Sequence, residues 1–163
     1  FHVQVFSTKS TMAETNSRGF SPLARWVQPS KMRMVALGMR AAIQEAVTAM
    51  RVGAREYAAT RGTHCSALFA DGACVALFED IGRHNTFDKL AGWCLLAGVD
   101  PAGMLLATTG RVSSEMLRKA ARLGVATVAS LSGPTDAAVR EARARGIRLA
   151  GYANSSRLTL YAG

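Results

Sequence analysis

Two strand–helix units with the same turn and helix-end signals follow each other over residues 104–146, and this repeat constrains the fold more than any other feature. In each unit an apolar run leads into a polar turn, then a helical pattern follows and a glycine, Gly124 or Gly146, ends it. Ser113 suits the cap of the first helix, and Pro134 suits the first turn of the second. Strands that alternate with short helices predict a layered α/β domain with a partly parallel sheet.

A β-hairpin is predicted before this repeat. The β-like runs 63–69 and 73–78 are joined through Asp71-Gly72, a dipeptide typical of tight hairpin turns. A helix then follows, which we expect to be capped by Asn85 and ended by Gly98. Because a hairpin contributes an antiparallel pair, we expect an α/β fold with a layered mixed sheet and helices on both faces.

The first thirty residues differ in composition from the rest. A short alternating run opens residues 1–30, which then become rich in Ser and Thr and carry Pro22 and Pro29. We interpret this region as a strand end followed by a mobile loop. A helical pattern begins after Ser30, so that residues 31–163 are predicted to form one α/β domain.

The composition limits the classes of protein that the chain can belong to. Of its 163 residues, 49% are hydrophobic, which predicts a globular protein rather than a disordered one. No apolar run is long enough to cross a membrane, and no signal peptide is recognisable. An odd number of dispersed cysteines favours buried thiols in a reducing compartment, here the cytoplasm, over a disulfide framework: Cys65, Cys74 and Cys94.

The net charge of +9 indicates an anionic partner. Much of the surplus lies in residues 1–63, so a solvated basic region is an equally good interpretation. A nucleic-acid partner is not expected, because neither a helix-turn-helix nor an aromatic-lined groove can be recognised.

Polar residues gather at four junctions between predicted elements. They are 61–64, 79–89, 108–113 and 154–157. Parallel strands end at one edge of a sheet, so the second and third junctions are expected to face the same ligand. Their glycines, arginines and hydroxyl groups would suit a phosphorylated, nucleotide-like molecule.

Structural explanations remain open for the same residues. Asp80 with Arg83, or Glu79 with Lys89, could form ion pairs. Arg111 could neutralise Asp80 or Glu115, and His84 could be a structural histidine. Asn85 and Ser113 are explained by helix capping alone.

Known catalytic patterns are not found in the sequence. The chain has no Gly-x-Ser-x-Gly elbow, no Walker loop and no Gly-x-Gly-x-x-Gly. The adjacent His64 and Cys65 would point to opposite faces of a strand and cannot form a nucleophile–base pair. The second half of the zinc-deaminase signature is missing, and no metal ligand is predicted.

Four segments carry a family resemblance in the right order. They are Thr63-His64-Cys65-Ser66-Ala67, Glu79-Asp80-Ile81-Gly82-Arg83-His84-Asn85 with Asp88-Lys89, Gly110-Arg111-Val112-Ser113-Ser114-Glu115-Met116, and Gly151-Tyr152-Ala153 through Tyr161. Over roughly residues 60–163 the chain resembles the FdhD family, the accessory sulfur-carrier proteins of formate dehydrogenase.

The resemblance implies a fold similar to that of the cytidine deaminases, without their zinc chemistry. It also implies that sulfur from a cysteine desulfurase is carried as a cysteine persulfide to the molybdenum or tungsten of bis-molybdopterin guanine dinucleotide, the cofactor of formate dehydrogenase. Binding of a GDP-like ligand and a homodimer are further implications. The alternative to a sulfur-transferring protein is a degenerate family member that binds the cofactor or a guanine nucleotide without transferring sulfur.

The predicted cofactor-binding residues combine the junctions with the family's binding segment. They are His64, Asp80, Gly82, Arg83, His84, Arg111, Ser113, Ala153, Asn154, Ser155, Ser156, Arg157 and Leu158. The family's sulfur-carrying loop holds Cys-Gly-x-Cys, which this chain lacks; Arg18 and Ser21 would correspond to its cysteines. Neither side chain can form a persulfide, which leaves Cys65 as a substitute thiol to consider.

Overall fold

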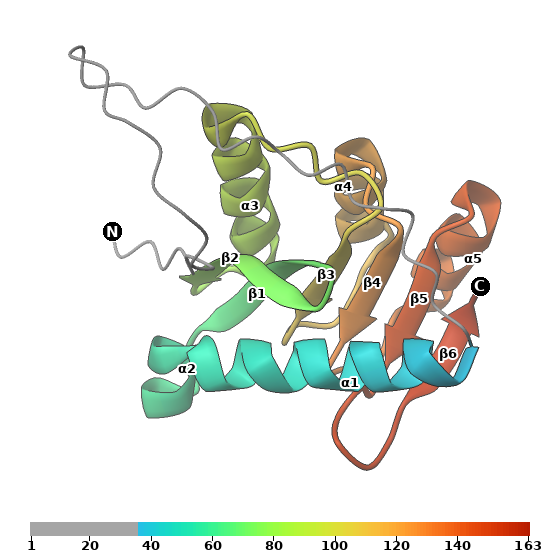
Figure 1. Cartoon of the computed structure of the whole chain (residues 1–163), viewed down its shortest axis with the longest axis horizontal. Coiled ribbons are helices and arrows are strands. Elements are labelled where there is room, and N and C mark those ends of the chain that lie inside the picture. Colours follow the sequence, from blue (N-terminus) through green and yellow to red (C-terminus); the bar gives the residue numbers. More distant parts are fainter. Residues whose placement is uncertain (1–35) are drawn as a thin grey trace.

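A computed structural model describes residues 36–163, which form a six-stranded sheet between two layers of helices (Figure 1). Three predictions lie outside the described residues. They are the strand end and mobile loop over 1–30, the helix start after Ser30, and the correspondence of Arg18 and Ser21 to the family's cysteines. The elements in chain order are α1 (Ala36–Gly53), α2 (Arg55–Thr60), β1 (His64–Ala70), β2 (Ala73–Asp80), α3 (Arg83–Ala97), β3 (Leu105–Thr108), α4 (Ser114–Leu123), β4 (Thr127–Ser130), α5 (Asp136–Arg145), β5 (Arg148–Gly151) and β6 (Thr159–Ala162).

The sheet is mixed, as the sequence predicted. Its strand order is β2-β1-β3-β4-β5-β6, with β3, β4 and β5 parallel and the other neighbours antiparallel. The hairpin turn adopts left-handed conformations at both Asp71 and Gly72, the geometry that Asp-Gly favours. This topology brings the ends of β2, β3, β4 and β5 and the starts of β1 and β6 to one edge of the sheet, called here the carboxyl edge.

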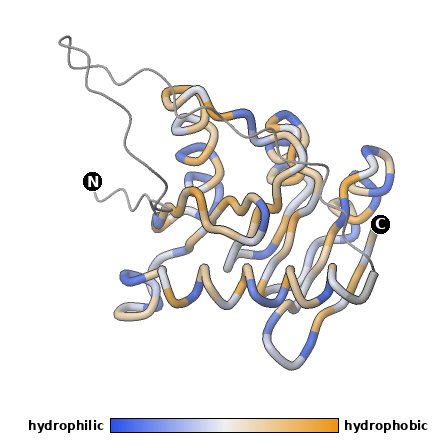
Figure 2. The backbone as a smooth tube through the Cα atoms, viewed as in Figure 1, coloured by the Kyte–Doolittle hydropathy of each residue, from blue (hydrophilic) through white to orange (hydrophobic). Residues whose placement is uncertain are grey.

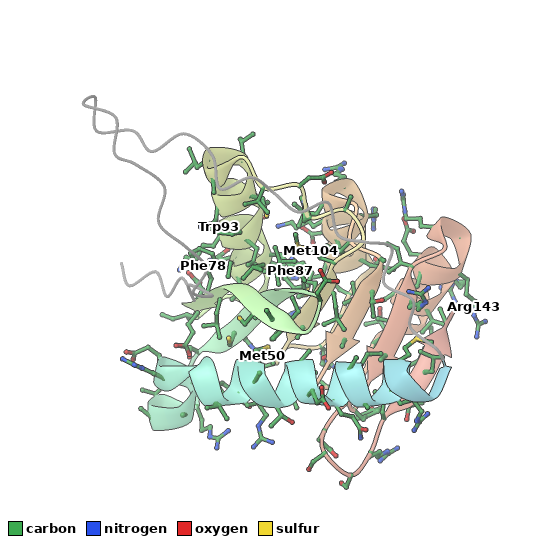
Figure 3. All side chains as sticks on the ribbon, viewed as in Figure 1. Met50, Phe78, Phe87, Trp93, Met104 and Arg143 are labelled. Carbon is green, nitrogen blue, oxygen red and sulfur yellow. The ribbon has the colours of Figure 1, made fainter. Side chains whose placement is uncertain are left out.

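Helix α1 covers one face of the sheet over a row of small side chains. Ala67, Ala107, Ala129 and Ala150 are in register across β1, β3, β4 and β5, and all four are buried. They pack with Ile43, Val47 and Met50 of α1, which are fully buried. Small residues in the sheet leave room for the long side chains of the helix, so the interface packs closely. Figure 3 labels Met50 in this layer.

Helices α3, α4 and α5 cover the opposite face, where the side chains are larger. Leu68, Leu106, Val128 and Leu149 point into this core, together with Phe87 of α3 and Leu117 of α4. Figure 2 shows hydrophobic colours along the strands and hydrophilic stretches along α5, as expected for a helix that contacts the core on one side only. Helices on both faces therefore confirm the predicted architecture.

Two predicted helix starts differ from the structure. α3 begins at Arg83 with Gly82 as its cap, so Asn85 is not the cap. α5 begins at Asp136 after a Thr135 cap, and Pro134 lies before it in a parallel bridge to Val112. The predicted cap Ser113 and the glycine ends of α3, α4 and α5 are confirmed.

Helix α2 is an element that the sequence did not predict. It has six residues, and none of its side chains is buried, so no apolar periodicity marks it. Its first N–H groups are held instead by a distant residue, because Glu79 accepts from Glu56 N at 3.1 Å and from Tyr57 N at 2.7 Å. A carboxylate at a helix start also interacts favourably with the helix dipole.

Candidate functional site

The carboxyl edge gathers all four polar junctions that the sequence singled out. The junctions 61–64, 79–89, 108–113 and 154–157 adjoin the β1 start, the β2 end, the β3 end and the β6 start in turn. A fifth junction, Ser130 to Pro134, lies between them at the end of β4 and was not predicted to contribute. The topology therefore brings together segments that lie up to about ninety residues apart in the chain, as open α/β folds do at a ligand site.

Asp80 organises the turn that leads into α3. Its Oδ1 accepts hydrogen bonds from Gly82 N at 2.8 Å and Asn85 Nδ2 at 2.9 Å, and its Oδ2 pairs with Lys89 Nζ at 2.6 Å. The hydrogen bond from Lys89 and those from Gly82 and Asn85 lower the pKa of the Asp80 carboxyl to about 2. Asp80 thus fixes the local backbone, whatever else it contacts.

These contacts correct the ion pairs considered from the sequence. Asp80 pairs with Lys89 rather than Arg83. Lys89 also donates to the backbone carbonyl of Glu79 at 2.9 Å, but it forms no ion pair with the Glu79 carboxylate. Arg111 is exposed and pairs with no carboxylate of residues 36–163. Neither Arg83 nor Arg111 therefore forms a structural ion pair within the described region.

His64, Arg83 and Gly110 meet where β1 starts and β3 ends. A Cβ built on Gly110 would lie 2.9 Å from Arg83 Cβ and 3.4 Å from His64 Nδ1. His64 Nδ1 lies 3.5 Å from the hydroxyl of Thr109. Burial, and secondly the positive charge of Arg83, lower the pKa of His64, so that its imidazole is neutral at pH 7.

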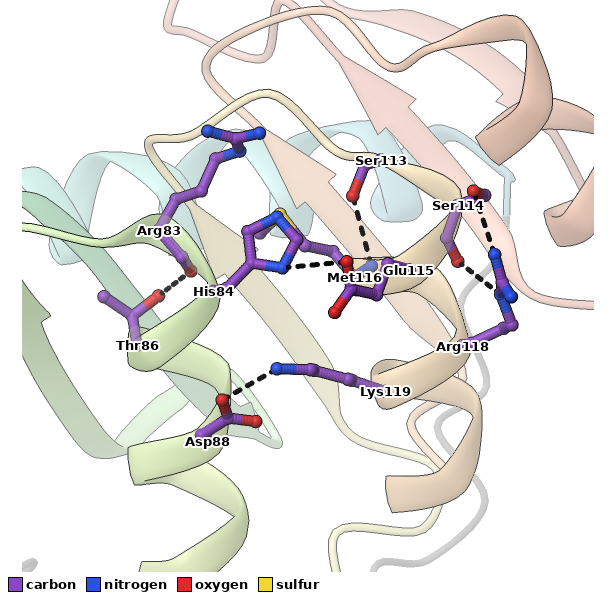
Figure 4. Close-up of polar contacts among 10 residues, drawn as sticks. All are labelled: Arg83, His84, Thr86, Asp88, Ser113, Ser114, Glu115, Met116, Arg118 and Lys119. Carbon is purple, nitrogen blue, oxygen red and sulfur yellow. Dashed lines mark hydrogen bonds and ion pairs between the residues drawn. The ribbon is translucent and has the colours of Figure 1, made fainter.

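Within residues 36–163, two polar side-chain atoms are buried without a hydrogen-bond partner. They are Nε of Arg83 and Oγ1 of Thr63, the residue before His64. Buried polar atoms in folded proteins are nearly always paired, and an exception asks for an explanation such as a missing ligand. Figure 4 draws the Arg83 guanidinium pointing away from the contacts between α3 and α4.

A layer of buried hydroxyl groups lies beneath this cluster. Ser66, Thr108 and Ser130 are aligned across β1, β3 and β4, and all are fully buried. Ser66 Oγ contacts Thr86 Oγ1 of α3 at 2.7 Å and Thr108 Oγ1 at 2.9 Å. Thr108 Oγ1 accepts from Gly110 N at 3.3 Å, and Ser130 Oγ donates to Gly110 O at 2.7 Å. The loop at Gly110 and the start of α3 are thereby held in fixed positions.

The start of α4 shows a different arrangement. Ser113 Oγ accepts from Met116 N at 3.3 Å, which is the predicted capping bond. His84 Nδ1 lies 3.6 Å from Glu115 Oε2, and Lys119 Nζ lies 2.7 Å from Asp88 Oδ2 (Figure 4). His84 therefore faces α4 and joins the two helices.

The turn between β5 and β6 is built by Asn154. Its Oδ1 accepts from the backbone N–H groups of Ser156 and Arg157, at 2.9 and 2.8 Å. Helix α1 contacts the same turn, since Gln44 Nε2 donates to Asn154 O at 2.7 Å and Arg40 donates to Leu158 O at 3.1 Å. Ala153 and Leu158 are buried, while Ser155, Ser156 and Arg157 are exposed.

An arginine–aromatic pair next to this turn was not anticipated. The guanidinium carbon of Arg157 lies 5.0 Å from the centroid of the Tyr152 ring. Tyr152 adopts a left-handed conformation with φ 51°, and its hydroxyl lies 2.5 Å from a Cβ built on Gly133. Non-glycine residues with positive φ are uncommon and are found more often at ligand sites. The sequence around Tyr152 carries no pattern that predicts this conformation.

The cysteines of the described region are free thiols in apolar surroundings. Cys65 and Cys94 are buried, and Cys74 is partly buried. Burial raises the pKa of Cys65 strongly and the pKa values of Cys74 and Cys94 to about 11. Since the thiolate is the nucleophile, raised pKa values make these thiols poorer nucleophiles at neutral pH.

Two other properties concern residues 36–163 alone. No three His, Cys, Asp or Glu side chains there lie close enough together to hold a metal ion. Of the helices in this region, none combines the length and the hydropathy that crossing a membrane requires.

Comparison with known proteins identifies the family. The model of the FdhD/NarQ family matches residues 6–163. The chain belongs to the FdhD/NarQ family. It is 43% identical over 111 residues to the sulfur carrier protein FdhD of Anaeromyxobacter sp. (strain K), which covers 63% of this chain and 38% of that protein. With the sulfur carrier protein FdhD of Anaeromyxobacter dehalogenans (strain 2CP-C) it shares 40% identity over 143 residues, 83% of this chain and 47% of that protein.

A solved structure agrees with this assignment. The crystal structure of a candidate formate dehydrogenase accessory protein from Desulfotalea psychrophila matches with a TM-score of 0.69 and 28% identity, over 76% of this chain and 56% of that one. This FdhD/NarQ chain thus spans less than half the length of the curated relatives described above. The likeness to the cytidine-deaminase fold remains a prediction.

Proposed function

We propose that this FdhD/NarQ chain is the cofactor-binding part of an accessory protein for formate dehydrogenase. Its substrate would be the bis-molybdopterin guanine dinucleotide cofactor, carrying molybdenum or tungsten, which the carboxyl edge would hold through its guanine nucleotide. The observation that carries the proposal is Arg83: among the described residues its buried Nε has no hydrogen-bond partner, and its guanidinium forms no ion pair with a carboxylate.

The residues at this edge suit an anionic, partly planar ligand. Arg83 and Arg111 offer forked donors to phosphate groups, and the start of α3 adds N–H groups that have no intrahelical partner. At the other end of the edge, Arg157 and Tyr152 offer flat groups next to the segment 153–158, which corresponds to the binding segment of the family. One ligand would need both a charged and a flat part to contact both regions, as a guanine nucleotide has.

Delivery of sulfur to the metal of the cofactor is the finer part of the proposal. The names of the relatives support it, and the partners would be a cysteine desulfurase and formate dehydrogenase in the cytoplasm, with the protein as a possible homodimer. A cysteine would have to receive the sulfur as a persulfide. The three thiols present are buried or partly buried and have raised pKa values, which disfavours each of them as acceptor.

A second candidate function follows from the same thiols. The chain would bind the cofactor or a guanine nucleotide and pass it on without carrying sulfur. The two candidates share the binding site and differ only in covalent chemistry, so two experiments separate them.

Binding is tested by thermal unfolding with GDP, guanosine and sodium chloride of equal ionic strength. GDP should raise the melting temperature, because a ligand that binds only the folded state stabilises it. Guanosine should raise it less, since it lacks the phosphates. No shift with millimolar GDP would contradict both candidates.

Sulfur transfer is tested by mass spectrometry of the intact chain after incubation with a desulfurase and cysteine. A gain of one sulfur atom that dithiothreitol removes would establish the carrier function. The variant Cys65→Ala/Cys74→Ala/Cys94→Ala is the control, and it should gain none. An unchanged mass of the wild type, together with GDP binding, would establish the second candidate.

A further inference from the structure

Arg83 and Gly110 approach each other very closely at the carboxyl edge. A Cβ on Gly110 would lie 2.9 Å from Arg83 Cβ and 3.2 Å from Arg83 Cδ. Real Cβ atoms essentially never show a contact under 3.0 Å, so even an alanine would displace the arginine or the loop. Gly110 has no left-handed conformation that would by itself require glycine. The missing side chain, rather than backbone freedom, is what this position needs.

Neither side of this contact can retreat easily. The loop at Gly110 is tied to the hydroxyl layer on both sides, through Gly110 N to Thr108 Oγ1 and through Ser130 Oγ to Gly110 O. The start of α3 is tied by Asp80 and by Thr86, whose hydroxyl donates to Arg83 O at 2.7 Å. The contacted Arg83 Cβ belongs to the stem of the side chain, which moves only with the helix. Gly110 therefore determines where Arg83 extends.

The acidic side chains around Arg83 are all paired elsewhere. Asp80 is bound to Lys89, Asn85 and Gly82 N, and Glu79 is bound to the first N–H groups of α2. Glu115 faces His84, and Asp88 faces Lys119. The neighbouring His64 is uncharged at neutral pH, so it neither repels Arg83 strongly nor neutralises it. Arg83 is left as a cation whose partner must come from outside the described residues.

We infer that Arg83, His64 and the first N–H groups of α3 form the subsite for the diphosphate of the ligand, and that Gly110 is the positioning residue that lets Arg83 reach it. This inference rests on the proposed function and specifies which part of a nucleotide binds where. A diphosphate carries several acceptor oxygens and at least two negative charges, which match a forked guanidinium beside a helix start.

The test is isothermal titration calorimetry with sodium pyrophosphate and with GDP at constant ionic strength. Arg83→Gln should weaken both ligands by about tenfold or more, because it removes a charge-assisted forked contact. Arg83→Lys should recover only part of the loss, since an ammonium group cannot form the fork. A matched surface control is Arg118→Gln, whose guanidinium contacts only Ser114 of its own helix and which should leave both affinities unchanged.

Gly110→Ala tests the positioning role separately. It should weaken pyrophosphate by about fivefold or more through displacement of Arg83. The matched control is Gly92→Ala in α3, where a built Cβ meets nothing within 4 Å. This variant should bind pyrophosphate with the affinity of the wild type. Melting curves establish that each variant is folded at the assay temperature, and Arg83→Gln carries the test if Gly110→Ala does not fold.

The outcomes separate this inference from the proposed function. GDP binding that is unaffected by Arg83→Gln would overturn the subsite and leave the proposed function standing. Equal pyrophosphate affinity of Gly110→Ala and Gly92→Ala would overturn the positioning role. Binding of neither GDP nor pyrophosphate to the wild type would overturn both.

Discussion

The starts of α3 and α4 occupy the same position in the fold, yet they differ in how their polar groups are satisfied. Both follow a strand that ends at the carboxyl edge, and both lie over the same face of the sheet. At α4, Ser113 caps the helix and Glu115 and Lys119 have partners on α3. At α3, the cap is a glycine without a side-chain hydrogen bond, and Arg83 keeps a buried nitrogen that has no partner in residues 36–163.

This difference separates a structural helix start from a candidate binding one. A side-chain cap satisfies one of the first N–H groups of a helix, which stabilises the protein and removes that donor from the set available to a ligand. An uncapped start next to a free arginine stabilises the protein less but can bind an anion. Substitutions at α4 should therefore change the free energy of unfolding, and substitutions at Arg83 should change ligand binding.

The largest loss of stability is expected from Thr108→Val, in the hydroxyl layer that supports both helix starts. The change leaves Gly110 N without the hydroxyl that accepts its hydrogen bond and removes one of the two hydroxyl partners of Ser66 Oγ, which should lower the free energy of unfolding by about 1–3 kcal/mol. Urea unfolding at pH 7 measures this loss. Thr48→Val is the control, because its exposed hydroxyl donates only to Gln44 O of the same helix. Equal stabilities of the two variants would contradict a supporting role for the layer.

The next effect concerns the cap of α4. Ser113→Ala should lower the free energy of unfolding by about 1 kcal/mol, the usual effect of losing an N-cap. Ser114→Ala, which loses only a contact with the exposed Arg118, should change it by less than about 0.5 kcal/mol. The affinity for GDP should remain that of the wild type in Ser114→Ala. If Ser113→Ala proves as stable as Ser114→Ala, the capping bond contributes nothing.

A pH effect is expected from Asp80 at the start of α3. Its pKa is about 2 in the folded protein and close to its ordinary value of 3.8 after unfolding. The folded state therefore gains stability from the carboxylate above about pH 4, and this gain is lost as the pH falls towards 2. Asp80→Asn should be less stable than the wild type at pH 7, with the difference shrinking at pH 2.5. A difference that does not depend on pH would show that the carboxylate charge is not responsible.

The smallest effect is expected from the surface pair that joins the two helix starts. His84→Gln removes the contact with Glu115, whose side chain is 65% exposed, and should change the free energy of unfolding by less than about 0.5 kcal/mol. Urea unfolding at pH 7 measures this difference. A loss above about 1 kcal/mol would assign His84 a structural role beyond this pair.

The sequence predicted the parts of this molecule that depend on local chemistry. The Asp71-Gly72 hairpin, the Ser113 cap and the glycine ends of three helices each follow from the preferences of the residues involved. The strand–helix repeat together with the hairpin then sufficed to predict a mixed sheet with helices on both faces. Because strand ends meet at one edge in such a sheet, the gathering of the polar junctions could also be predicted.

The remaining features depend on contacts between distant residues. Asn85 has the chemistry of a cap, but Asp80 binds both its side chain and Gly82 N, and the helix starts three residues earlier, with Gly82 as its cap. Helix α2 depends on Glu79, more than twenty residues further on. The alignment of Ser66, Thr108 and Ser130, like the contact between Arg83 and Gly110, exists only once the strand register is fixed. No local preference encodes any of these.

Hydrogen–deuterium exchange with and without GDP tests the central claim most directly, because it locates the ligand on the sheet. The carboxyl edge binds the nucleotide if peptides covering 61–66, 79–86 and 108–113 exchange more slowly with GDP. The loops at the opposite edge, 98–104, 124–126 and 146–147, should then exchange at an unchanged rate. Slower exchange confined to those opposite loops, or no change anywhere at saturating GDP, would contradict the account.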